Sequence, residues 1–429
     1  MLILFVLEYV KFITQMCDIF FKINKKITCI YVIKNEVERL VIMKNGVNDM
    51  EIKKILLLSA LTTVAVSSHA EIRIGVVSSS TGPVAMVGIP QRNTIALLPK
   101  MIAGEKVTYI SLDDASDPTA SVKAVNKLIN ESNVDAIIGP SGSPNANAVI
   151  GTIAKAQVPL LAPVGTSTVV LPMNEQRKWV FKTTQNDELI AEALVEDMVK
   201  RKIKTLGFIG TADPYGENWS KVVSALAAKK GIKVTQKESF QRQDTSLTGQ
   251  ALKLIAGKPQ AILIAAPGSA AVTPQVALYD RGYRGQVYQT HGAALDQFLK
   301  LGGKKVENTI LAASLMLVID EVANTHPSKA VALQYMNNYK KAYGSYPATF
   351  GANVYDAGLL LEKAIPIALK QSKPGNVKFR QALRSALEQT KELAATQGVY
   401  NMTPMDHSGF DKRGRVMITV KNGQWTLLK

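Results

Sequence analysis

The chain has 429 residues, of which 47% are hydrophobic and 20% charged, so a disordered or fibrous protein is excluded and two or more domains fit within it. Its formal net charge of +17 would suit a nucleic-acid-binding protein. The basic residues are nevertheless dispersed over amphipathic segments such as residues 195–204 and 221–233, with little aromatic interleaving. We therefore expect a solvated basic surface and no nucleic-acid partner.

The N-terminal 70 residues differ from the rest of the chain. Residues 50–54 form a short basic start, residues 55–66 an apolar run, and Ser68-His69-Ala70 resembles a small-x-small cleavage site. This pattern predicts a secretory signal peptide over residues 50–70, cleaved before Glu71. Because no cysteine follows the cleavage site, no lipid anchor is predicted, and we expect the protein in the periplasm.

Residues 1–49 precede this internal signal, where a signal peptide cannot normally work. We interpret them as a doubtful upstream segment, with translation starting at Met50 or Met43. A membrane anchor is the alternative, because the segment contains apolar stretches, although charged residues interrupt them. Both cysteines, Cys17 and Cys29, lie in this segment, so no disulfide is expected in the secreted chain.

From residue 71 onward, short aliphatic or β-branched runs alternate with segments of helical spacing. The predicted strands are residues 72–77, 107–112, 136–138, 160–162, 205–209, 233–237, 261–265 and 286–290, and the predicted helical segments include 121–131, 188–202 and 219–230. This order predicts an α/β fold with two doubly wound lobes of parallel sheet, dividing near residues 180–184. Dehydrogenases, kinases and binding proteins share such lobes, so the motifs must separate these functions.

Two hydroxyl-rich turns within residues 137–168 each follow an apolar run. Ser141, Gly142 and Ser143 lead into a predicted helix, and residues 163–167 follow the second run. Free N–H groups and hydroxyls at the carboxyl ends of neighbouring parallel strands commonly hold a carboxylate or a similar polar group. These turns therefore predict a small-ligand site.

No catalytic, cofactor or metal motif stands out. Residues 75–83 contain neither a dinucleotide-binding nor a phosphate-binding loop, and residues 139–143 place Ser143 where a nucleophile elbow requires glycine. The histidines lack short metal-ligand spacing. We expect no catalytic residue, no cofactor and no metal, and hence no enzyme.

The acidic group Asp113, Asp114 and Asp117 could bind Ca²⁺ or act as an acid/base pair. No later Gly and Glu complete a calcium loop, and Asp117 or Thr119 at a helix start would cap free N–H groups, so a structural role is predicted. Asp406-His407 is likewise interpreted as a polar turn before a closing strand at residues 416–420.

Several motifs occur in a characteristic order: Ser80-Thr81-Gly82-Pro83, Leu112-Asp113-Asp114-Ala115-x-Asp117-Pro118, Ile138-Gly139-Pro140, Ala162-Pro163-x-x-Thr166, Asp213-x-Tyr215-Gly216 and Gly398-Val399-Tyr400. With them, the sequence resembles the type I periplasmic substrate-binding proteins of ABC transporters, around the leucine/isoleucine/valine-binding proteins, over nearly all of residues 71–429. The resemblance implies two lobes joined by three hinge crossings and a ligand between them. Lobe I would comprise residues 71–183 and 316–400, and lobe II residues 184–315 and 401–429.

The resemblance also implies a ligand-binding set. Ser143 would hold the ligand carboxylate, Val164 would supply main-chain groups and Thr166 a hydroxyl, and Tyr215 would close over the ligand. His291 stands where amino-acid-binding members carry an acid that pairs with the α-ammonium. Val87 and Pro267 stand at two positions that are aromatic in those members.

A buried ammonium without a carboxylate partner would cost on the order of several kcal/mol. An aromatic or aliphatic acid without an amine therefore fits at least as well as a branched-chain amino acid, unless His291 is a turn residue without ligand contact. The resemblance implies a monomeric solute-binding component of an ABC importer that delivers its ligand to a membrane permease. A periplasmic ligand-sensing subunit and a two-lobed α/β enzyme are the alternatives.

Overall fold

The computed structural model of the protein describes residues 71–347 and 349–428. The interpretations of residues 1–49 and 50–70 lie outside these residues. Among the described residues, none of the helices combines the length and the apolar character needed to cross a membrane.

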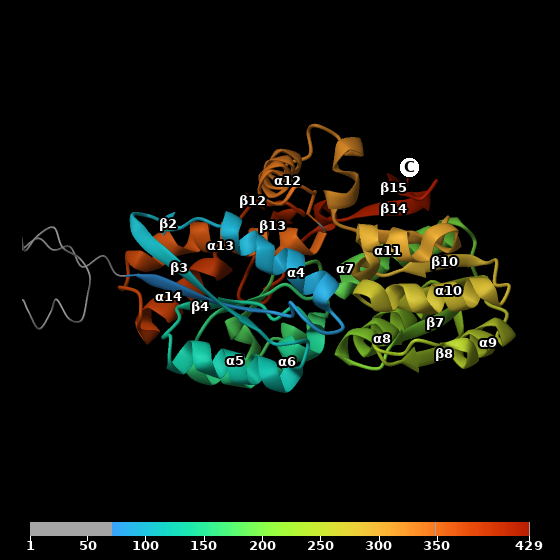
Figure 1. Ribbon diagram of the computed structural model, residues 1–429, viewed down its shortest axis with the longest axis horizontal. Helices are drawn as coiled ribbons and strands as arrows, with labels where there is room; N and C mark the ends of the chain where they lie inside the picture. The colour runs from blue at the N-terminus through green and yellow to red at the C-terminus, as the bar shows by residue number, and fades with distance from the viewer. Residues whose placement is uncertain (1–70, 348, 429) are drawn as a thin grey trace, which may run out of the picture. The chain divides into compact units, whose positions relative to one another are not determined.

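The first sheet has six strands in the order β2-β3-β1-β4-β5-β6 (Figure 1). They are β1 (Ile72–Ser78), β2 (Met101–Ile102), β3 (Glu105–Asp113), β4 (Ala136–Ile138), β5 (Leu160–Ala162) and β6 (Val180–Lys182). All neighbours are parallel except β2 and β3. The parallel order brings the carboxyl ends of β4 and β5, and the turns that follow them, to the same edge.

Helices cover both faces of this sheet. Buried residues of α5 (Pro118–Asn130) and α6 (Ser143–Ala156) form an apolar cluster with Ile137 and Leu160. On the other face, α13 (Thr349–Leu369) and α14 (Val377–Glu388) pack with Ile72 and Ile74 of β1, and α4 (Ala85–Thr94) lies against α13. This two-sided cover explains why β4 and β5 are apolar throughout.

The second sheet has seven strands in the order β15-β14-β11-β10-β9-β7-β8. They are β7 (Thr205–Thr211), β8 (Lys233–Phe240), β9 (Ala261–Ala265), β10 (Gln286–Gln289), β11 (Ile310–Ala313), β14 (Val416–Lys421) and β15 (Gln424–Leu427). The core of the sheet is parallel, whereas β14 and β15 are antiparallel additions from the end of the chain. The predicted α/β fold with two parallel-dominated lobes is confirmed.

Helices α7 (Asp187–Lys200) and α8 (Pro214–Lys229) cover one face of the second sheet, with Trp219 fully buried. The other face carries α9 (Thr248–Ala256), α10 (Val272–Asp280) and α11 (Asp296–Gly302). Helix α12 (Lys329–Tyr343) joins the same apolar cluster through Tyr335 and Tyr339, and Tyr335 also shares a hydrogen bond of 2.8 Å with Thr94 of α4.

The chain passes between the two sheets along three connections. It leaves the first sheet after β6, returns after β11 to form α13 and α14, and leaves again between the short β13 (Val399–Tyr400) and β14. β13 pairs with β12 (Leu393–Ala394). The individual lobe boundaries predicted above stay predictions.

The acidic group after β3 is structural, as predicted. Asp117 accepts a hydrogen bond of 2.6 Å from the Ala120 N–H and caps α5. Asp114 is fully buried and accepts hydrogen bonds from the hydroxyls of Ser79 and Ser121, both at 2.7 Å. No group of three metal-ligating side chains gathers anywhere in the described part of the chain.

The turn at His407 is also structural. The imidazole is buried, its Nδ1 lies 2.8 Å from the Val180 carbonyl, and its ring stacks on Phe181 with centroids 4.1 Å apart. These contacts join the final connection to β6.

Candidate functional site

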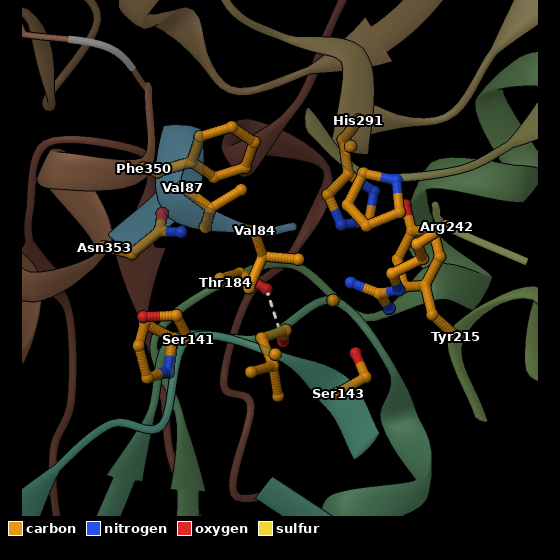
Figure 2. A pocket seen from close by; sticks show the side chains of 16 residues that line it. Val84, Val87, Ser141, Ser143, Thr184, Tyr215, Arg242, His291, Phe350 and Asn353 are labelled. Atoms are coloured by element: carbon orange, nitrogen blue, oxygen red, sulfur yellow. Dashed lines mark hydrogen bonds between the residues drawn. The ribbon is translucent and has the colours of Figure 1, made fainter. Parts of the chain in front are cut away.

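A cavity lies between the two lobes, and the free space in it and at its solvent-open mouth together amounts to about 420 Å³. Small-ligand sites commonly occupy such positions between domains. The first lobe contributes the start of α4, the turns after β4 and β5 and the start of α13, and the second contributes the turns after β7, β8, β9 and β10 (Figure 2). Thr184 comes from the connection that follows β6. The lining residues are Val84, Val87, Ser141, Gly142, Ser143, Pro163, Val164, Gly165, Thr184, Tyr215, Arg242, Pro267, His291, Gly292, Phe350 and Asn353.

The turn after β4 offers an uncapped helix N-terminus. Ser143 is the first residue of α6 and lines the cavity, and the N-cap residue Gly142 has no side chain to satisfy the first N–H groups. Ser141 also lines the cavity, where its hydroxyl accepts a hydrogen bond of 3.0 Å from the Ser79 N–H. This turn can donate hydrogen bonds to an anionic ligand group.

The turn after β5 is fixed by side chains that bind its carbonyl oxygens. The carbonyls of Pro163, Val164 and Gly165 accept hydrogen bonds from Gln91 (3.4 Å), Thr184 (2.9 Å) and Lys182 (2.5 Å), respectively. The N–H groups of Val164 and Gly165 have no partner among the residues that the structure describes. They are therefore available to a ligand.

Thr166, in the same turn, does not line the cavity. Its side chain is fully buried and its hydroxyl lies 3.0 Å from the hydroxyl of Thr168. The structure thus brings Ser143, Val164, Tyr215 and His291 of the predicted set together at the cavity wall, along with Val87 and Pro267, and leaves Thr166 behind it.

In the second lobe, the N-terminus of α8 positions Tyr215. The Asp213 carboxylate accepts hydrogen bonds from the N–H groups of Tyr215 (2.8 Å) and Gly216 (3.3 Å). The Tyr215 hydroxyl donates to Thr290 at 2.8 Å, and its ring meets that of His291 edge to face at 6.1 Å. Because the hydroxyl is engaged, Tyr215 offers mainly its ring to the cavity.

His291 is a neutral hydrogen-bonding group at this wall. Burial, and then the nearby Lys182 ammonium, lower the pKa of His291 to about 3. Its Nδ1 atom is buried and has no hydrogen-bond partner within the described chain. A neutral imidazole carries one donor and one acceptor nitrogen, so His291 can pair with a polar ligand group without adding charge.

Arg242 is a cavity residue that the sequence analysis missed. It follows β8, its Nε donates to the Asp213 carboxylate at 2.6 Å, and its side chain is only 12% exposed. Its Nη2 is buried and unpaired in the described structure. A basic residue directly after a strand could have pointed to Arg242. The strand was predicted to end at residue 237, however, whereas β8 continues to Phe240.

Among the described residues, the cavity wall therefore presents an unpaired arginine N–H and no carboxylate. Arg242 is charged, whereas no aspartate or glutamate among the described residues lines the cavity. The nearby carboxylates are engaged elsewhere, because Asp213 binds Arg242 and caps α8 while Asp187 accepts a hydrogen bond of 2.6 Å from Asn218. Such a wall favours a ligand anion and disfavours a buried ammonium.

Comparisons with known proteins agree with this fold and site. A family model described as periplasmic binding protein matches residues 71–424. An extracellular ligand-binding receptor from Rhodopseudomonas palustris HaA2 is 44% identical, covers 84% of this chain and 100% of its own, and superposes with a TM-score of 0.82. The Leu/Ile/Val-binding protein homolog 3 of Brucella melitensis is 23% identical over 78% of this chain and 88% of its own length.

A more distant solved structure is the branched-chain amino acid transporter substrate binding protein LivJ from Streptococcus pneumoniae in complex with isoleucine. It is 19% identical, covers 84% of this chain and 99% of its own, and has a TM-score of 0.67, which shows a common fold. These relatives are described as binding proteins or receptors. The chain belongs to the periplasmic binding protein family, whose members act in the periplasm or outside the cell.

Proposed function

We propose that this protein captures a small carboxylate without an amine between its lobes, in the periplasm, and delivers it to the membrane permease of an ABC importer. The observation that carries the proposal is the composition of the cavity wall, where Arg242 keeps an unpaired Nη2 and no described acid is present. An aromatic or aliphatic acid is the expected class, because Val84, Val87, Pro267 and Phe350 supply apolar surface.

The carboxylate is expected at the end of the cavity where Ser143 and Arg242 lie (Figure 2). The first N–H groups of α6, the Ser143 hydroxyl and the unpaired Arg242 Nη2 are all donors. Hydrogen bonds between a carboxylate and a guanidinium are short and roughly twice as strong as neutral ones. No bond is made or broken, so the work of the site is recognition.

An α-amino acid would place an ammonium in the same space. Its amine would lie near Arg242 and a neutral His291 without a carboxylate on the wall to compensate its charge. The cost of burying an unpaired ammonium is on the order of several kcal/mol. We therefore expect binding to follow the carboxylate and to be weakened by the amine.

Matched ligand pairs test this proposal. Leucine is compared with 4-methylpentanoate, and phenylalanine with 3-phenylpropanoate, because each pair differs in the amine alone. An acid that binds should raise the free energy of unfolding by about 2.7 kcal/mol when present at about a hundred times its dissociation constant, as measured by thermal shift and calorimetry. Stabilisation by leucine or isoleucine, and by no amine-free acid, would refute the proposal.

Substitution of Arg242 tests the residue that carries the argument. Arg242→Met should weaken binding of the best acid by about 2–3 kcal/mol, roughly 30- to 150-fold, because the ligand carboxylate loses a charged partner. Arg413→Met is the matched control, since Arg413 binds Glu392 and Asp411 on the surface and does not line the cavity. Equal affinities of the two variants would contradict the role of Arg242.

A further inference from the structure

One buried side chain in the cavity wall has no partner and no role in holding a carboxylate. Asn353 lies in the first turns of α13, lines the cavity and is 3% exposed. Its Oδ1 is buried without a hydrogen-bond partner, and its amide makes no hydrogen bond to any described residue. Buried polar groups are rarely left unpaired in native proteins, so this amide requires an explanation.

The same helix carries another buried polar side chain, and that one is paired within the protein. Asp356, three residues further along α13 and fully buried, accepts hydrogen bonds from the Thr396 N–H (2.8 Å) and hydroxyl (2.6 Å). That carboxylate is satisfied by the protein itself. Asn353 has no such neighbour, and the space in front of it is the cavity.

Apolar residues separate Asn353 from the carboxylate-binding end. Figure 2 shows Asn353 beside Phe350 on one side of the cavity and Arg242 with His291 on the other, with Val84 between them. Thr184 lies beside Val84, but its hydroxyl already donates to the Val164 carbonyl at 2.9 Å, so the unpaired polar groups of the cavity lie at two separate ends. A ligand that binds only through a carboxylate would bury the Asn353 amide without a partner.

We infer that Asn353 is a second polar subsite, which selects an acid carrying a hydroxyl at the end opposite its carboxylate. This inference rests on the proposed function, because it takes the carboxylate to lie near Arg242. A primary amide has an acceptor oxygen and a donor nitrogen, so it complements a hydroxyl, which also has both. An analogue lacking the hydroxyl leaves the amide unpaired and is disfavoured.

Two ligand pairs test the inference: 4-hydroxybenzoate against benzoate, and 4-hydroxyphenylacetate against phenylacetate. The two hydroxylated acids differ in the distance between carboxylate and hydroxyl, so the test does not depend on one value of that distance. Calorimetry on the protein should show that the hydroxylated member of at least one pair binds about 10-fold more tightly. The variant Asn353→Leu should reduce that ratio to about 2-fold or less while still binding the acid without a hydroxyl.

Val87→Ala is the control for a change in cavity shape, because Val87 lines the cavity and has no polar group. Val87→Ala should weaken the binding of both members of a pair and leave the ratio of their affinities unchanged. The thermal stability of empty Asn353→Leu should not fall, since the amide has no protein partner to lose. A marked loss of stability would indicate a structural role and overturn the inference.

The outcomes separate this inference from the function on which it rests. Equal binding of both members of each pair would overturn the role of Asn353 and leave the proposed carboxylate ligand standing. Failure of all four acids at millimolar concentration would also overturn the inference. The proposed function would then be refuted only if 4-methylpentanoate and 3-phenylpropanoate failed as well.

Discussion

At the residue scale, Arg242 and His291 supply unpaired polar groups to the second-lobe wall of the cavity. Arg242 is held by Asp213 and keeps an unpaired N–H at the wall, and His291 is buried in its neutral form. Arg242 follows β8 and His291 follows β10, so folding of the second lobe brings them to the same wall. Their identity was readable in the sequence, but the position of Arg242 at the cavity was not, because it depends on where β8 ends.

Burial of His291 predicts a pH dependence of stability. Its pKa is about 3 in the folded protein against 6.5 in the unfolded chain, so the unfolded chain binds the extra proton between these values. The contribution of neutral His291 to the free energy of unfolding is therefore fully present above pH 6.5 and is lost as the pH decreases toward 3. Between pH 7 and pH 5, the wild type should lose about 2 kcal/mol more free energy of unfolding than His291→Gln.

Denaturant unfolding at both pH values measures this difference. The variant is the reference, because both chains share every other titrating group and their common acid dependence cancels. The same loss in the two proteins would show that His291 does not resist protonation.

At the element scale, the turns after β4 and β5 form part of the first-lobe wall, and they are built differently. The first is the uncapped start of α6, whereas the second is fixed by three side chains bound to its carbonyls. The second turn also meets the other lobe directly. A Cβ atom added at Gly165 would lie 2.6 Å from His291 Nε2 and 2.8 Å from Tyr215 Cε2.

Gly165→Ala is therefore expected to obstruct the approach of the lobes. Its methyl group would displace the rings of Tyr215 and His291, and ligand affinity should fall by at least about 10-fold, or 1.4 kcal/mol. Gly151→Ala in α6 is the control, because a Cβ there meets nothing within 4 Å and should stabilise the helix by about 0.5–1 kcal/mol. Calorimetry and thermal unfolding of both variants measure these effects.

At the scale of the whole molecule, the first connection between the lobes contains a buried polar network. Asn218 of α8 donates to Ser167 of the first lobe at 3.2 Å and to Asp187 of α7 at 2.6 Å. Burial lowers the pKa of nearby Lys182 and raises that of Asp187. The Asn218–Ser167 hydrogen bond joins α8 of the second lobe to the turn after β5, so separating the lobes would break it.

The closed cavity also predicts a conformational change on binding. Ser143, Tyr215 and Asn353 are buried, so a ligand cannot reach them unless the lobes separate by hinge motion. In solution scattering, the ligand-free protein should have a larger radius of gyration than the protein saturated with its best acid. Gly165→Ala should show a smaller decrease at saturation. An unchanged radius of gyration in the wild type would contradict the closure mechanism.

The sequence by itself determined the alternation of strands and helices, the division into two lobes, and the strand-end turns that carry Ser143 and Val164. These features are local, because apolar periodicity and turn residues encode them over a few positions. The turns after β4 and β5 could be placed at the same edge of the sheet because the carboxyl ends of parallel strands lie at the same edge.

Only the tertiary structure decided which of these residues share a wall. Thr166 lies in the expected turn, yet its side chain points behind the wall and pairs with Thr168, since its orientation depends on packing within the turn. Arg242 and Asn353 come from segments 111 residues apart and meet at the cavity through folding of both lobes. Their placement in one cavity wall depends on contacts between distant segments, which a local sequence pattern does not encode.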